Sequence, residues 1–178
     1  MPGGAHLSFV ARRRFVPSSR SAGRLGRAAV VACCAATCLA AAGCRHVGAV
    51  RVDPPSGHAS STGCSALLQA LPTTLMGRVS RPVSPDDAMA AAWGDPAIVL
   101  RCGVPPPASL KPTSRCDVVD GVGWFSRQDE DHDWIFTTIG RTTNVELRVP
   151  SDYTPAADAL VDVAGAVNDG LPVSQPCV

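Results

Sequence analysis

The chain carries its densest group of potential metal ligands at residues 129–133, which read DEDHD. The three aspartates of this run stand at alternate positions and match the first three ligand positions of a calcium-binding loop. The match then ends, because position six is Trp134 where the loop needs glycine, and position twelve is Gly140 where it needs a bidentate glutamate. A solvated turn between two strands explains the composition better. We therefore predict no metal site and no cofactor.

Signatures of catalysis are also missing from the sequence. A catalytic zinc site needs about three protein ligands and an open position, but His132 is the only histidine after residue 62. The patterns G-x-S-x-G, H-E-x-x-H and S-x-x-K do not occur, and neither does a glycine-rich phosphate-binding loop. We assign no catalytic residue, and an enzyme without a recognisable signature stays open as an alternative.

The eight cysteines divide into two groups of four. One group lies in the N-terminal segment and ends at Cys44, and the other consists of Cys64, Cys102, Cys116 and Cys177. Outside the cytoplasm, an even number of cysteines with no C-x-x-C among them predicts two structural disulfides, for which three connectivities are possible. We predict Cys102–Cys116, because a proline-rich loop turns the chain back between them. The second predicted pair, Cys64–Cys177, would hold the C-terminal tail against a helix.

Residues 1–43 have the pattern of an export signal. Six arginines and no acidic residue precede Cys44, and an uncharged run covers residues 28–42. The sequence Ala41-Ala42-Gly43-Cys44 resembles a bacterial lipobox, in which the cysteine receives a diacylglycerol and becomes the N-terminus. We predict Cys44 as the lipid attachment site, while secretion after an A-x-A cleavage and an uncleaved anchor stay open. The protein is then extracytoplasmic, either lipid-anchored at the cell membrane or secreted.

After this segment the chain carries ten basic residues against fifteen acidic ones. A domain with that excess of negative charge has no field to attract nucleic-acid backbones, and it contains no basic stripe with interleaved aromatic residues. We therefore predict no nucleic-acid partner. The expected partners are the membrane, through the N-terminal anchor, and a protein of the cell envelope.

Composition also divides the mature chain into a tether and a domain. Residues 44–62 lack hydrophobic periodicity and are rich in proline, glycine and serine, which predicts a flexible tether. Residues 63–178 are long enough for a single domain. Helical periodicity and capping signals predict short helices at residues 64–71 and 85–93. A last helix is predicted to start at Thr154-Pro155 and to end at Gly170.

Between these helices, β-branched and alternating residues predict strands at residues 97–101, 118–119, 122–125, 134–139 and 143–149. Asp120-Gly121 is a favoured pair for the tight turn of a hairpin. The short connections favour an antiparallel meander. The expected class is α+β, a small antiparallel sheet with short helices on one face, reinforced by disulfides.

Four stretches of the sequence resemble a known family: CSALLQALP from Cys64, WGDPAIVLRCG from Trp93, GVGW from Gly121 and FTTIGR from Phe136. On these motifs the chain resembles an actinobacterial family of exported, membrane-associated proteins catalogued only as a domain of unknown function. The WGDPAIVLRCG stretch is the most specific. The resemblance implies a location in the cell envelope and no assigned reaction. Since Gly123 stands where the family often has an acid, we place no catalytic role there.

Four residues of these motifs have side chains suited to ligand binding, namely Trp93, Asp95, Arg101 and Arg141. One hypothesis is that they line a pocket for an anionic envelope ligand. The alternative, which we favour, is a structural ion pair between Asp95 and a buried arginine beside a packed tryptophan. The predicted function is a tethered, non-catalytic binding or assembly module of the cell envelope. The competing function is an envelope enzyme that acts on cell-wall or lipid precursors.

Overall fold

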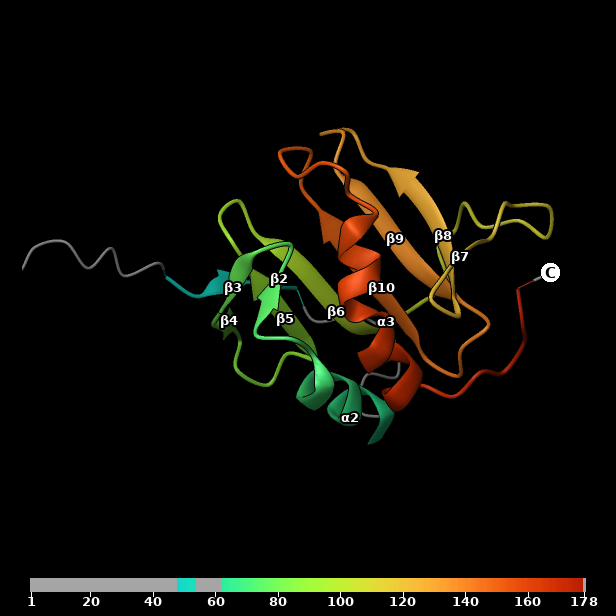
Figure 1. Cartoon of the computed structure of the whole chain (residues 1–178), viewed down its shortest axis with the longest axis horizontal. Coiled ribbons are helices and arrows are strands. Elements are labelled where there is room, and N and C mark those ends of the chain that lie inside the picture. The colour runs from blue at the N-terminus through green and yellow to red at the C-terminus, as the bar shows by residue number, and fades with distance from the viewer. Residues whose placement is uncertain (1–47, 54–61, 178) are drawn as a thin grey trace, which may run out of the picture. The chain divides into compact units, whose positions relative to one another are not determined.

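A computed structural model describes residues 48–53 and 62–177 of the chain (Figure 1). The predicted export signal and Cys44 lie outside these residues. The described part contains two helices, α2 (Thr62–Ala70) and α3 (Asp158–Gly170). Neither of them has the length and apolar character that a membrane span requires.

The main sheet has eight strands in the order β2-β3-β5-β6-β10-β9-β8-β7, and all neighbours in it are antiparallel. Two meanders therefore meet at β6 and β10, which lie in the centre of the sheet. The strands are β2 (Thr74–Leu75), β3 (Arg78–Arg81), β5 (Ala90–Trp93), β6 (Ile98–Val104), β7 (Asp117–Val119), β8 (Val122–Gln128), β9 (Trp134–Ile139) and β10 (Asn144–Val149).

Both helices cover the same face of this sheet, which confirms the predicted α+β class (Figure 1). The core lies between the helices and the sheet, and its largest fully buried side chains include Trp93, Trp124 and Leu100. The two helices approach closely at Gly170, where a Cβ atom would lie 2.7 Å from the backbone nitrogen of Leu67. A residue without a side chain is therefore needed at this crossing.

Strand formation follows the sequence pattern most closely in the second meander. In β10, Val145, Leu147 and Val149 are buried, while Glu146 and Arg148 project from the other face, as their alternation predicts. The predicted hairpin turn joins β7 to β8, and its Asp120 and Gly121 both have positive φ angles, 46° and 78°. This conformation is the one that a two-residue hairpin requires.

The predicted helix at residues 85–93 is wrong. Its second half is strand β5, in which Ala90 lies opposite Arg101 and Trp93 opposite Ile98 on β6. Strand β3 pairs with the other edge of β5, so this segment has hydrogen-bond partners on both sides. Long-range pairing and burial of Trp93 thus outweigh the local helix signals.

The helix at residues 64–71 is confirmed as α2, and the last helix ends at Gly170 as predicted. Its start differs from the prediction, because α3 begins at Asp158 with Ala157 in the cap position and without a side-chain cap. The Thr154-Pro155 pair therefore precedes the helix by a further turn and does not cap it.

The predicted tether is ordered over part of its length. Strand β1 (Val50–Arg51) pairs in parallel with β4 (Val83–Ser84), and Val52 is buried next to Ala88 and Ala90. The Arg81 guanidinium also donates a hydrogen bond to the carbonyl oxygen of Gly48, at 2.9 Å. Here the chain lies against the domain, because two valines at alternate positions meet a small apolar cluster beside β5.

The four domain cysteines form two disulfides, as predicted, but the predicted pairing is wrong. The pairs are Cys64–Cys102, with a Cα–Cα distance of 5.7 Å, and Cys116–Cys177, at 6.1 Å. Cys102 points to the helix-covered face of β6, where α2 presents Cys64. Cys116 stands instead beside the edge strand β7, where the C-terminal tail passes. The pairing of the cysteines is therefore determined by which elements are neighbours in the fold, and not by the turn between Cys102 and Cys116.

Candidate functional site

The face of the sheet without helices carries two rows of side chains that cross its central strands. Because residues opposite each other on paired strands share a face, the first row consists of Arg101, Glu146, Thr137 and Phe125. By the same pairing, the second row consists of Val99, Arg148, Ile135 and Arg127. Charged and apolar residues thus lie side by side on a surface opposite the core.

A groove of about 370 Å³ lies over these rows, and we call it the arginine groove. The segment that follows β1 forms one wall of it with Val52 and Asp53, and the apolar part of its floor is Val99 and Ile135. Four arginines line it and give it its name: Arg51, Arg101, Arg127 and Arg148. Asp129 and Glu146 complete the set of charged groups.

Glu146 is the centre of one group of ion pairs in the arginine groove. Its carboxylate accepts a hydrogen bond from Arg101 at 2.5 Å, and its other oxygen lies 3.8 Å from the guanidinium of Arg127. The Glu146 side chain is 15% exposed, while those of Arg101 and Arg127 are about one-third exposed. One largely buried negative charge therefore faces two positive charges.

The acidic run at residues 129–133 forms the turn between β8 and β9, as predicted, and surrounds Arg148. The guanidinium of Arg148 lies 2.9 Å from Asp129, 3.5 Å from Asp131 and 2.9 Å from Asp133. Asp129 also accepts hydrogen bonds from the backbone N–H groups of Asp131 and Asp133, which close the turn. Within residues 48–53 and 62–177, no group of three or more metal-ligand side chains is arranged to hold an ion.

Trp93 and Asp95 lie apart from this groove. Trp93 is 1% exposed in the core on the opposite face of the sheet, and its indole N–H donates to the carbonyl oxygen of Pro72 at 2.9 Å. Asp95 is 79% exposed and lies 3.6 Å from Arg81. Trp93 is therefore packed in the core, and the ion-pair partner of Asp95 is Arg81, which lies outside the family-like motifs.

Arg141 is buried at the end of β9, where it holds the C-terminal end of α3. Its guanidinium donates hydrogen bonds to the carbonyl oxygens of Leu171 (2.7 Å) and Gly121 (3.0 Å) and to the side chain of Asn168 (2.6 Å). Burial lowers the pKa of Arg141. No carboxylate pairs with it among the described residues, so neutral acceptors replace the ion pair expected for a buried arginine.

The four ligand-binding candidates from the sequence therefore do not share one pocket. Only Arg101 lines the arginine groove, while Trp93 faces the helices and Arg141 joins α3 to the β7–β8 turn. The sequence analysis missed Arg51, Arg127, Glu146 and Arg148. The charged positions that alternate with valine and leucine in β10 were the available signal, but the register of four strands is needed to place them together.

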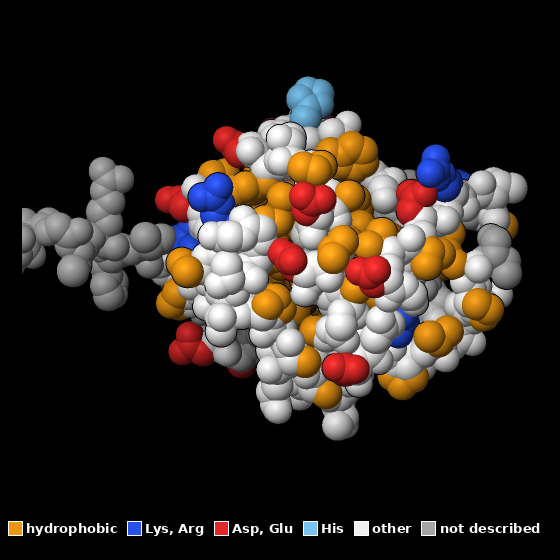
Figure 2. All heavy atoms as spheres, viewed as in Figure 1, with side chains coloured by type: hydrophobic (Ala, Val, Ile, Leu, Met, Phe, Trp, Pro, Cys, Tyr) orange, Lys and Arg blue, Asp and Glu red, His pale blue; other side chains and the backbone are white. Residues whose placement is uncertain are grey.

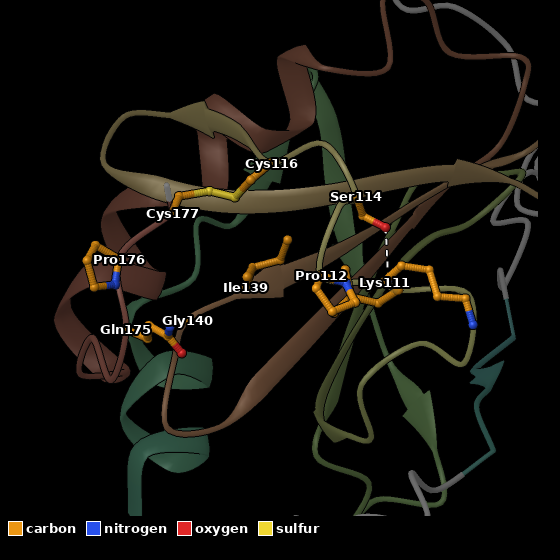
Figure 3. Close-up of a pocket in the computed structure, with 10 residues that line it drawn as sticks. Lys111, Pro112, Ser114, Cys116, Ile139, Gly140, Gln175, Pro176 and Cys177 are labelled. Carbon is orange, nitrogen blue, oxygen red and sulfur yellow. Dashed lines mark hydrogen bonds between the residues drawn. A yellow bond between two sulfur atoms is a disulfide. The ribbon is translucent and has the colours of Figure 1, made fainter.

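A second hollow, of about 360 Å³, lies beside the Cys116–Cys177 disulfide (Figure 3). The loop before β7 and the C-terminal tail border it, and Ile139 of β9 lies between them. Ser114 accepts a hydrogen bond from the backbone N–H of Lys111, while the Lys111 side chain extends away from the hollow (Figure 3). Few charged groups meet here, so the arginine groove is the better candidate site.

The fold and the site define a disulfide-reinforced α+β domain with a charged groove on its helix-free face. The family model described as "Protein of unknown function (DUF3515)" matches residues 25–176. This range is most of the chain, so the protein belongs to that family, as the motifs predicted. No curated protein and no solved structure matches the chain.

Proposed function

We propose that the protein is an exported protein of the cell envelope, anchored by lipid at Cys44, whose domain is a non-catalytic binding or assembly module. The two disulfides are the observation that carries this proposal. Disulfides of this structural kind form and persist outside the cytoplasm, where the environment is oxidising. The arginine-rich leader and the small residues before Cys44 supply the export signal that such a location needs.

The charged groups of the arginine groove support a binding role. Arg101 and Arg148 are held by carboxylates at 2.5–2.9 Å, which fixes their guanidinium groups in place. Fixed guanidinium groups are suited to recognition of a ligand or partner, because little conformational freedom is lost on binding.

Cell fractionation and intact-mass analysis test the proposal. The protein should occur in the membrane fraction, with a mass that corresponds to a chain starting at Cys44 plus a diacylglycerol group. The substitution Cys44→Ala should release an otherwise folded domain that retains both disulfides. A membrane protein that still contains residues 1–43, or a soluble product that starts before Cys44, would contradict lipid anchoring.

The disulfides need their own measurement, because they carry the assignment of compartment. Protein isolated in the presence of a thiol-blocking reagent should show no reactive thiol at the four domain cysteines. Cytoplasmic protein expressed without the leader serves as the control and should contain free thiols. Free thiols throughout the protein isolated from its natural location would show that it does not reside in an oxidising compartment.

A further inference from the structure

We infer that the arginine groove binds the phosphate group of a small phosphate ester through Arg51, Arg101 and Arg127. This ligand class deepens the proposed binding function, and its expected source near the membrane rests on the proposed anchor. The face of the molecule that carries the helices shows acidic and apolar side chains interspersed over its surface (Figure 2). The arginine groove on the other side differs from it in gathering four guanidinium groups around one space.

The charges that line the groove are paired unequally. Arg148 is matched by three carboxylates within 3.5 Å. Arg101 and Arg127 share the single carboxylate of Glu146, and the 3.8 Å separation leaves Arg127 outside hydrogen-bonding distance. The donors of Arg127 are thus available to a ligand. At this part of the groove, positive charge exceeds negative charge.

Arg51 adds a further cation to the same space from the opposite wall. It makes no ion pair with any residue that the structure describes, and its side chain is exposed. Asp53 lies on the same wall as Arg51, and its carboxylate offsets one of the positive charges. Apart from Arg148 and its aspartates, the groove lining therefore holds three guanidinium groups against two carboxylates, a net charge that an anion would neutralise.

A phosphate ester fits both the charge and the shape of this space. Guanidinium groups present a planar fork of N–H donors that matches two oxygens of a phosphate. The volume of about 370 Å³ is close to the lower end of small-ligand sites, which suits a phosphate with a short carbon group such as glycerol. Val99 and Ile135 supply an apolar floor for that carbon part.

The short stretch of chain between Cys44 and the described domain indicates where the phosphate would come from. Only three residues separate Cys44 from Gly48, which Arg81 holds against the domain. The four Cα–Cα steps from Cys44 to Gly48 reach at most about 14 Å in extended chain. A lipid on Cys44 would therefore hold the β1 side of the domain, which includes Arg51, close to phospholipid headgroups. Lipid headgroups and soluble phosphate esters share the recognised chemistry, and the experiment distinguishes them.

Calorimetric titration of the full chain in a non-ionic detergent tests this inference. The probes are glycerol 3-phosphate and a short-chain phosphatidylglycerol, at low ionic strength so that exposed charges are not screened. We expect saturable binding with one site. The substitution Arg127→Gln should weaken it about tenfold, the effect of losing one charge-assisted hydrogen bond. Binding of both probes identifies phosphate esters in general, and binding of phosphatidylglycerol alone identifies the headgroup.

Two further variants separate ligand binding from a structural role. Arg115→Gln removes the same charge from an 87% exposed side chain outside the groove, so binding should not change. Glu146→Gln removes the carboxylate that competes with the ligand, so binding should become tighter even if the protein melts at a lower temperature. If Glu146→Gln does not fold, Arg127→Gln and Arg115→Gln still decide the question.

Binding of neither probe, or equal binding by Arg127→Gln and Arg115→Gln, would overturn the inference. The titration does not need the lipid on Cys44. If mass analysis contradicts the lipid anchor, the titration therefore still tests the groove inference independently.

Discussion

The two disulfides should contribute unequally to stability, and the buried one should contribute more. Their loops span 38 and 61 residues and do not overlap, so each restricts the unfolded chain independently. In the loop-entropy model these closures stabilise by about 3.9 and about 4.3 kcal/mol, which ranks Cys116–Cys177 slightly higher. Chain entropy by itself therefore predicts nearly equal losses.

Packing reverses that order. Cys64 and Cys102 are both 0% exposed within the main core, whereas Cys116 and Cys177 are only partly buried. Replacing the buried pair by alanine leaves a cavity between α2 and β6, which adds about 1–3 kcal/mol to the loss. We expect Cys64→Ala with Cys102→Ala to cost more than Cys116→Ala with Cys177→Ala, by the cavity contribution less about 0.4 kcal/mol of loop entropy.

Urea unfolding of the two double variants measures this difference. Both variants should show a larger dependence of the unfolding free energy on urea, because each unfolded chain is less restricted. The comparison must therefore use free energies extrapolated to water and not transition midpoints. An equal loss, or a larger loss for the Cys116–Cys177 variant, would refute the argument from packing. Under native conditions a thiol reductant should also open Cys116–Cys177 first, which peptide mapping detects.

Three other predictions concern the fold and its charged groups. Arg141→Met should lower the free energy of unfolding by about 2–4 kcal/mol, because the buried carbonyl oxygen of Leu171 and the partly buried acceptors on Gly121 and Asn168 lose a charged donor. Arg115→Met at the surface should change it by less than about 1 kcal/mol, as chemical denaturation will show. Gly170→Ala should lower the melting temperature, since its Cβ collides with the backbone of α2. Gly165→Ala in the same helix meets nothing within 4 Å and should raise it, and a fall at both positions would contradict the close crossing. Finally, calorimetric titration with calcium should give no saturable binding, because Arg148 occupies the carboxylates of the 129–133 turn. A micromolar isotherm that Asp131→Asn abolishes would contradict this.

Local sequence signals determined the elements whose residues interact mainly with near neighbours. The β7–β8 turn depends on Asp120 and Gly121, and the alternation in β10 depends on which face of one strand is buried. Helix α2 and the end of α3 at Gly170 follow from apolar spacing and from a glycine. Each of these features can be recognised within about ten residues of sequence, because the physical cause lies within that distance.

Tertiary structure decided the features that depend on which distant strands become neighbours. Residues 90–93 have helix signals, but they form β5 because β3 and β6 supply hydrogen bonds on both sides. The cysteine partners follow from the same topology. Cys102 belongs to β6, which lies in the centre of the sheet under α2, whereas Cys116 directly precedes the edge strand β7.

The arginine groove depends on sheet register in the same way. Arg127, Glu146 and Arg101 belong to three different strands, with β9 lying between the first two. A shift of one residue in any of these pairings would turn a charged side chain towards the core. No local pattern encodes such a register, because it is fixed by the burial of apolar residues on the opposite face of the whole sheet.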